Sequence, residues 1–264
     1  MIEILQYGFM QNALLAGGIA SVLCGVMGIY VILNRLVFIG GGIAHSAFGG
    51  IGLGYLLGAN PLIFAIIFSL ATALGIGAVS ERSKVSFDTA IGVFWAVGMS
   101  LGIVFVSKSP GRAPDLFDYL FGNILAVSYF DIKIISALTL GMIVLVALFY
   151  KELLILSFDP LYGEALGLPV FRLRLLLLSM VALSVVVLIK IVGIILVIAL
   201  LTIPGAIGRQ HAKNLKGIMI LSILLGISFV SAGLLASYHL NTPSGATIIL
   251  AASGAFFVST IIAR

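Results

Sequence analysis

Uncharged apolar runs, separated by short polar segments, recur along the whole chain and restrict what it can fold into. A helix needs about 20 consecutive apolar residues to cross a lipid bilayer, and most of these runs are long enough. Of the 264 residues, 62% are hydrophobic and 9% are charged, whereas soluble domains carry roughly 25% charged residues. The chain has too little polar surface to face water, and it is predicted to lie in lipid.

The apolar runs predict an all-α protein, a polytopic membrane helix bundle with about nine transmembrane helices and a range of eight to ten. The predicted spans are 9–33, 37–58, 61–80, 89–107, 131–150, 173–190, 191–208, 217–237 and 245–262. The sixth and seventh form one apolar stretch, interrupted by Lys190 and Gly193. Residues 1–264 are predicted to form a single transmembrane domain.

The positions of lysine and arginine predict the orientation, because cytoplasmic segments of membrane proteins collect these residues. With the N-terminus outside, the inner segments hold ten of them: Arg35, Arg82, Lys84, Lys151, Arg172, Arg174, Arg209, Lys213, Lys216 and Arg264. The outer segments then hold four: Lys108, Arg112, Lys133 and Lys190. The N-terminus is therefore predicted outside and the C-terminus in the cytoplasm. The net charge of +5 reflects this placement and not nucleic-acid binding. The first run is too long for a signal peptide and has no basic segment before it.

Small residues recur at every fourth position of the second predicted span, within IGGGIAHSAFGGIGLG (39–54) and just beyond it. This small-residue stripe consists of Gly42, Ser46, Gly50, Gly54 and Gly58. The first span repeats the pattern at Ala13, Gly17, Ser21 and Gly25. Stripes of this kind let two helix backbones approach closely in lipid. The second span is therefore predicted to be a buried helix, with His45 beside its stripe.

The polar residues exclude several classes of protein. All nine acidic residues lie outside the predicted spans or at their ends: Glu3, Glu81, Asp88, Asp115, Asp118, Asp131, Glu152, Asp159 and Glu164. Ion-coupled secondary transporters usually hold a carboxylate inside the membrane, so another energy source is expected. The sequence lacks both a phosphate-binding loop and the H-E-x-x-H motif, so neither ATP hydrolysis nor zinc-dependent proteolysis is expected of this chain. The single cysteine, Cys24, provides no disulfide framework.

The segment KELLILSFDPLYGEALGLPVFR (151–172) predicts a short helix outside the membrane, near 159–167. Asp159 is a good N-cap, Pro160 suits the first helical position, and Gly167 ends the helix. Its apolar side chains have no evident core to enter: Leu161, Ala165 and Leu166. The helix is either a docking surface for another protein or an interfacial linker.

Five segments resemble one family of transporters. DPLYGEALGL (159–168) is similar to the coupling-helix motif of ABC importer permeases. The other segments are IAHSAFGGI (43–51), LFDYLFGNILAVS (116–128), VGIILVIALLTIPGAIGRQHAKN (192–214) and SYHLNTPSGATIIL (237–250). Together they resemble, in order and over nearly the whole chain, the permeases of zinc/manganese/iron ABC uptake systems.

This resemblance implies a multi-pass permease of a prokaryotic plasma membrane, built as a homodimer on the plan of vitamin and siderophore importers. Separate ABC ATPase subunits would bind ATP and dock on the coupling helix, and an extracytoplasmic solute-binding protein would deliver the metal. No cofactor is expected on this chain. The residues expected to contact the ATPase are Asp159, Pro160, Glu164, Ala165 and Gly167.

The resemblance also makes His45 the candidate metal ligand of the transport pathway, since imidazole binds zinc, manganese and iron. Family members usually have an aspartate four residues earlier, where this chain has Gly41. The change removes an oxygen ligand and favours zinc over manganese. In the structural alternative, His45 hydrogen-bonds a carbonyl or a serine between two helices.

His239, on the predicted outer side, could meet incoming metal, whereas His211 is expected to be solvated. The outer loop 108–118 is expected to touch the binding protein.

The sequence therefore predicts the permease of an ABC importer for a divalent transition metal. An importer of the same architecture for a metal chelate, such as a siderophore or cobalamin, is the alternative within this class. A secondary carrier or channel is the alternative outside it, and an enzyme is less favoured still.

Overall fold

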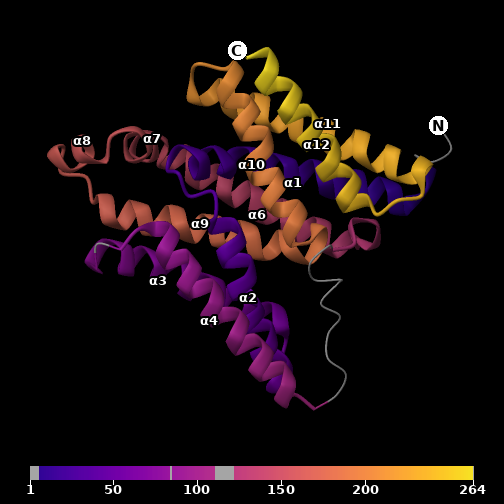
Figure 1. Ribbon diagram of the computed structural model, residues 1–264, viewed down its shortest axis with the longest axis horizontal. Coiled ribbons are helices and arrows are strands. Elements are labelled where there is room, and N and C mark those ends of the chain that lie inside the picture. Colours follow the sequence, from indigo (N-terminus) through magenta and orange to yellow (C-terminus); the bar gives the residue numbers. More distant parts are fainter. Residues whose placement is uncertain (1–5, 84, 111–121, 264) are drawn as a thin grey trace. The chain divides into compact units, whose positions relative to one another are not determined.

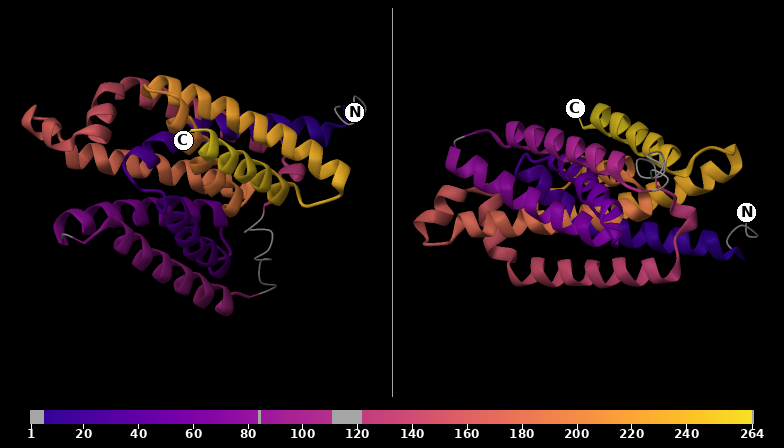
Figure 2. Two further views of the ribbon diagram at one scale, coloured as in Figure 1. Left: turned by 45° about the horizontal axis from the view of Figure 1, so that its top comes forward. Right: turned by 90° about the horizontal axis from the view of Figure 1, so that it is seen from below.

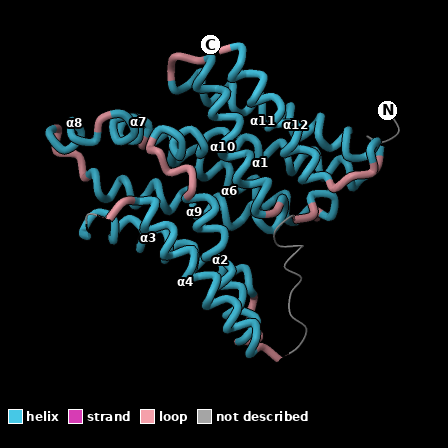
Figure 3. The backbone as a smooth tube through the Cα atoms, viewed as in Figure 1, coloured by secondary structure: helices cyan, strands magenta, loops and turns pink. Residues whose placement is uncertain are grey.

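A computed structural model describes residues 6–83, 85–110 and 122–263, and these are helical, with short connections and no strand (Figure 3). The elements are α1 (Gly8–Leu33), α2 (Ile39–Leu56), α3 (Pro61–Ser83), α4 (Phe87–Lys108), the 3-10 turn η2 (Ile124–Ala126), α6 (Tyr129–Leu148), α7 (Tyr150–Phe158), α8 (Pro160–Ala165), α9 (Val170–Val192), α10 (Ile194–His211), α11 (Leu215–Leu240) and α12 (Ser244–Ile262). Figure 1 labels the α-helices.

Eight of these helices are long and apolar enough to cross a membrane, which makes the chain a multi-pass membrane protein. They are α1, α3, α4, α6, α9, α10, α11 and α12. The ninth long helix, α2, is not among these eight, and seven of its 18 residues are glycines. Most of its residues are buried against protein, so it does not need an apolar surface toward lipid. The number of spans lies within the predicted range.

The chain forms two compact units, each built from separate stretches of sequence. Unit 1 consists of Met1–Ile32, Leu116–Leu145 and Leu188–Arg264, and unit 2 of Leu33–Asp115 and Val146–Val187. The assignment of 1–264 to a single permease domain stays a prediction.

In unit 2, glycines bring α2 against both α3 and α4, and Figure 2 shows these three helices in violet and magenta. A Cβ atom on Gly50 would lie 2.2 Å from the carbonyl oxygen of Phe64 in α3. A Cβ on Gly98 of α4 would lie 2.4 Å from the Cα of Ser46. Neither contact leaves room for a side chain, so the three backbones touch directly, as small residues allow in membrane helices.

The small-residue stripe is divided between the two neighbours of α2. Gly42 and Ser46 face α4, while Gly50 and Gly54 face α3. Residues four apart drift by about 40° around a helix, because a turn takes 3.6 residues. The inclusion of Gly58 was wrong: α2 ends at Leu56, and a Cβ on Gly58 would meet nothing within 4 Å.

In unit 1, the stripe of α1 packs along α11. A Cβ on Gly17 would lie 2.4 Å from Val230, and one on Gly25 would lie 2.6 Å from Ile223. Between them, a Cβ on Gly226 of α11 would lie 3.0 Å from Ser21. The three contacts follow α1 and α11 in opposite directions, so the two helices are antiparallel neighbours with a common small-residue seam.

The apolar stretch predicted for the sixth and seventh spans breaks at Gly193, between α9 and α10. Gly193 has φ 80° and ψ 163°, a conformation that is essentially restricted to glycine.

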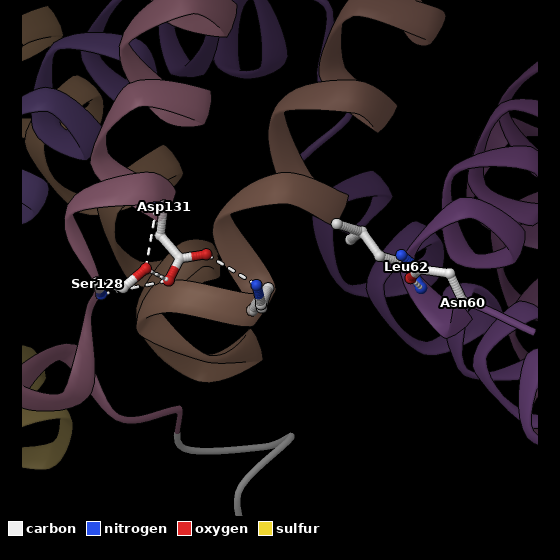
Figure 4. Close-up of polar contacts among 5 residues, drawn as sticks. Asn60, Leu62, Ser128 and Asp131 are labelled. Carbon is white, nitrogen blue, oxygen red and sulfur yellow. Dashed lines mark hydrogen bonds and ion pairs between the residues drawn. The ribbon is translucent and has the colours of Figure 1, made fainter.

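Just before the break, Lys190 Nζ lies 2.8 Å from Asp131 Oδ1 at the start of α6. Asp131 Oδ2 also accepts hydrogen bonds from the Ser128 hydroxyl (2.6 Å) and backbone N–H (3.2 Å), which forms a capping box (Figure 4). The same figure shows Asn60, whose Oδ1 accepts from the Leu62 N–H (3.0 Å) at the start of α3.

Replacing Gly193 by alanine is expected to destabilise the protein by about 1–3 kcal/mol, because a Cβ atom strains this backbone conformation. Thermal unfolding of the purified chain in detergent measures the change. Gly141→Ala on α6 is the matched control, since a Cβ there would meet nothing within 4 Å. Equal midpoints for the two variants would contradict the strain assigned to Gly193.

Candidate functional site

His45 lies in the middle of α2 and is half-buried in unit 2. Its ring stacks on the indole of Trp95 from α4, with centroids 4.4 Å apart and planes 7° from parallel. Among the described residues, no hydrogen-bond partner is found for either ring nitrogen. A hydrogen bond between these helices comes from the neighbouring Ser46, whose hydroxyl donates to the carbonyl oxygen of Phe94 at 2.8 Å.

This arrangement leaves the imidazole able to act as a ligand. A neutral imidazole offers one in-plane lone pair to a metal ion, and stacking occupies only the face of the ring. The six described acidic residues lie at helix ends or outside the spans: Glu81, Asp88, Asp131, Glu152, Asp159 and Glu164. Within the described residues, no group of three or more His, Cys, Asp or Glu side chains could hold a metal ion. A single chain therefore offers one nitrogen ligand here, not a closed metal cage.

The other two histidines belong to unit 1. His211, at the end of α10, has its Nε2 2.8 Å from the Ser259 hydroxyl of α12. The same hydroxyl donates to Oε1 of Gln210, so His211 joins a small polar network and is not simply solvated as expected. His239 is exposed at the end of α11, with its ring edge-on to Tyr238 at 5.8 Å between centroids.

The short helix predicted near 159–167 is α8, Pro160–Ala165. At its start, Asp159 Oδ1 accepts from the Tyr162 N–H at 3.0 Å, and Pro160 occupies the first turn. At its end, the Gly167 N–H donates to Glu164 (2.9 Å) and the Leu168 N–H donates to Gly163 (3.0 Å). This is a Schellman motif, and Gly167 takes the left-handed conformation that it requires (φ 77°).

One side of α8 packs on the protein and the other is open. Gly163 is buried, and a Cβ there would lie 3.1 Å from Ile155 of α7 and 3.2 Å from Val170 of α9. The exposed side holds the acidic residues Asp159 and Glu164 together with Ala165 and Gly167. It also holds large apolar side chains, with these exposed fractions: Leu161 77%, Tyr162 55% and Leu166 54%.

The α7–α8 segment is tied to the turn that leads into α2. Asn34, just after α1, donates from Nδ2 to the Ser157 hydroxyl of α7 at 2.9 Å. At the same end of unit 2, Arg174 of α9 pairs with Glu81 of α3 at 2.8 Å. These contacts tie α7 and α9, the helices before and after α8, to other parts of unit 2.

Sequence reasoning missed Trp95 and the glycines that bring α4 to α2. Gly98 and Gly102 are four residues apart, the same signal that identified the stripe in α2. Nothing in the sequence pairs Trp95 with His45. Two expectations extend beyond the described residues: most of the outer loop 108–118 and the first part of the segment 116–128 are outside them.

Known proteins resemble this chain over nearly its whole length. It matches the ABC 3 transport family over residues 6–263. It is 45% identical to an uncharacterized membrane protein of Synechocystis sp., over 100% of this chain and 94% of that protein. It is 36% identical to the manganese transport system membrane protein MntC of Halalkalibacterium halodurans, over 96% of this chain and 87% of that protein.

The fold is also similar to that of a chain in the solved structure of PsaBC from Streptococcus pneumoniae in complex with Fab. The TM-score is 0.86 at 34% sequence identity, and the match covers 98% of this chain and 93% of that one. Together the matches confirm the family and the all-helical membrane fold predicted from the sequence.

Proposed function

Because this chain belongs to the ABC 3 transport family, we propose that it is the membrane permease of an ATP-driven importer of divalent transition-metal ions. The observation that carries the proposal is the similarity, over nearly the whole chain, to proteins named as manganese transport membrane proteins. Such a chain moves an ion across the bilayer and performs no covalent chemistry, so it is a transport subunit and not an enzyme.

The energy for transport comes from a separate ATPase subunit. The chain has no phosphate-binding loop, and the acidic residues of its described part lie at helix ends, away from any position suited to ion coupling. The exposed side of α8 is the surface on which the ATPase docks, with Asp159, Pro160, Glu164, Ala165 and Gly167 in contact. Buried Gly163, on the opposite side of α8, packs against α7 and α9. A movement of α8 on docking is therefore transmitted directly to these two helices.

The metal passes His45, and two copies of the chain form the pathway as a homodimer. One imidazole from each copy gives a site of low coordination number, which binds an ion and can also release it. The absence of a larger ligand cluster in the described part of one chain supports a site completed by a second copy. An extracytoplasmic binding protein delivers the ion to the outer face, where His239 would meet it in the N-terminus-outside orientation.

We place zinc ahead of manganese and iron as the transported ion. Nitrogen ligands suit zinc, whereas manganese favours carboxylate and carbonyl oxygens. Gly41 stands one turn before His45, where the family usually has an aspartate, and no described acidic residue lies along α2. The manganese transport of the relatives keeps manganese as the second ion to be tested.

Uptake into proteoliposomes tests the proposed function. The vesicles would contain this chain with its ATPase and binding protein, and radioactive zinc or manganese would be supplied outside with ATP inside. ATP-dependent accumulation of either ion is the expected result, with zinc taken up at the lower concentration. Uptake without nucleotide would identify a secondary carrier or channel. Uptake of a siderophore or cobalamin complex, but of neither free ion, would identify a chelate importer.

A charge on the exposed side of α8 is expected to uncouple ATP hydrolysis from transport. In Ala165→Asp, docking of the ATPase would bury an unpaired carboxylate. A penalty of about 1.4 kcal/mol in the free energy of docking is sufficient for a tenfold loss of affinity. We expect metal uptake per ATP hydrolysed to fall at least about tenfold, while the unfolding midpoint of the chain is unchanged. The measurement is the ratio of uptake to phosphate release in the same vesicles.

Ala165→Ser is the matched control, because it adds a hydroxyl but no charge. A bulky residue at Gly167 should also uncouple, but its φ of 77° strains any side chain there, so Ala165 provides the cleaner test. Normal coupling in Ala165→Asp would remove the assignment of α8 as the ATPase contact.

A further inference from the structure

We infer that Trp95 is a positioning residue of the metal pathway: its indole holds the His45 imidazole in the orientation in which it meets the ion. The inference rests on the proposed function and adds to it a residue that neither the sequence pattern nor the family resemblance assigns. The observation behind it is the near-parallel stack of the two rings, 4.4 Å apart between centroids.

The stack is fixed by the backbones on which the two rings stand. Ser46, next to His45, donates its hydroxyl to the carbonyl oxygen of Phe94, next to Trp95. A Cβ on Gly98, one turn further along α4, would lie 2.4 Å from the Cα of Ser46. This hydrogen bond and this close backbone contact join α2 and α4 at the level of the two rings, and they set the distance between the indole and the imidazole.

Stacking determines what the imidazole can do. The nitrogens of a histidine ring bind metals in the plane of the ring, so an indole on its face leaves both nitrogens accessible while preventing rotation of the ring. A metal-bound imidazole carries part of the positive charge of the ion. The electron-rich face of an indole attracts such a ring more strongly than a neutral one. Trp95 therefore favours the metal-bound state of His45 in addition to orienting it.

The chain itself supplies a probe of this contact. Trp95 is its single tryptophan and is 37% exposed, so the intrinsic fluorescence of the chain reports on one ring. Manganese is paramagnetic and quenches a fluorophore that it approaches closely. In the assembled permease and ATPase, in lipid nanodiscs, the Trp95 signal is obtained as the difference from a Trp95→Phe complex.

We expect manganese to quench the Trp95 signal to saturation, and we expect zinc to reverse the quenching by competition. In His45→Ala the saturable quenching should disappear. Quenching that persists unchanged in His45→Ala would overturn the inference, because the ion would then lie near Trp95 without binding His45.

Variants of Trp95 separate positioning from general packing. Trp95→Leu is expected to raise the metal concentration for half-maximal uptake about fivefold, with little change in maximal rate, as expected for a lost ring–cation contact. Trp95→Phe keeps a flat ring and should restore most of the affinity. Phe105→Leu is the matched control on α4, since the Cβ atom of Phe105, 3.2 Å from the Cβ position of Gly52, is kept by leucine.

The outcomes distinguish this inference from the proposed function. Normal metal affinity in Trp95→Leu would overturn the role of Trp95 and leave the importer standing. Absence of metal uptake by the unmodified complex would remove both. If Trp95→Leu does not assemble, the quenching of the unmodified chain, with and without His45, still decides the question.

Discussion

Alanine in place of His45 is expected to reduce ATP-dependent zinc uptake at least about 100-fold. Removing even an outer-shell partner of a metal site costs 10–100-fold in affinity or activity, and His45 is the proposed ligand itself. In a homodimer the substitution removes the imidazole from both copies at once. The measurement is initial uptake of radioactive zinc into vesicles that hold the complete transporter.

His211→Ala is the matched control for this prediction. His211, at the end of α10, is hydrogen-bonded to Ser259 of α12 and has no proposed role in the pathway. Both variants should assemble with the ATPase and hydrolyse ATP. If His45→Ala transports zinc as the unmodified chain does, His45 has a packing role and another group binds the ion.

Alanine in place of Gly50 is expected to destabilise the protein by about 3 kcal/mol or more, at the upper end of overpacking substitutions. A Cβ atom there would lie 2.2 Å from the Phe64 carbonyl oxygen and 2.8 Å from the Ala65 Cα. Both atoms belong to the backbone of α3, so no side-chain rotation relieves the clash and the two helices must separate. Loss of the folded state on heating in detergent measures the effect.

Gly92→Ala on α4 is the matched control in the same unit. Gly92 is exposed, and a Cβ there would meet nothing within 4 Å. This variant should keep or slightly raise the unfolding midpoint, because alanine favours the helix over glycine by about 1 kcal/mol. Equal midpoints for Gly50→Ala and Gly92→Ala would show that α2 and α3 are not packed backbone to backbone.

The ends of α8 illustrate what sequence reasoning can predict. Asp159 and Pro160 were predicted as the N-terminal signals of a short helix and Gly167 as its end, and the structure has all three in those places. The prediction succeeded because caps and turns are satisfied by residues within a few positions of one another. The limits of the long helices follow from equally local information, the length of each apolar run.

The stripe in α2 illustrates where such reasoning stops. Its period predicted close packing, and Gly42, Gly50 and Gly54 do stand where no side chain fits. The period could not say that two different helices share the stripe, and it extended too far, to Gly58. Which neighbour a residue contacts depends on how helices far apart in the chain are arranged. The sequence of α2 by itself does not specify that arrangement.

The local chemistry of the chain is therefore sufficient to specify a multi-pass helical membrane protein, the position of its short helix α8, and His45 as the unusual residue of a buried span. The contact between His45 and Trp95 needed the folded molecule. Those residues are distant in sequence, and they meet only because Gly98 and Ser46 let α2 and α4 touch. Hydropathy and helix caps act within a few turns of one helix, whereas the orientation of a metal-binding ring is set by packing between helices.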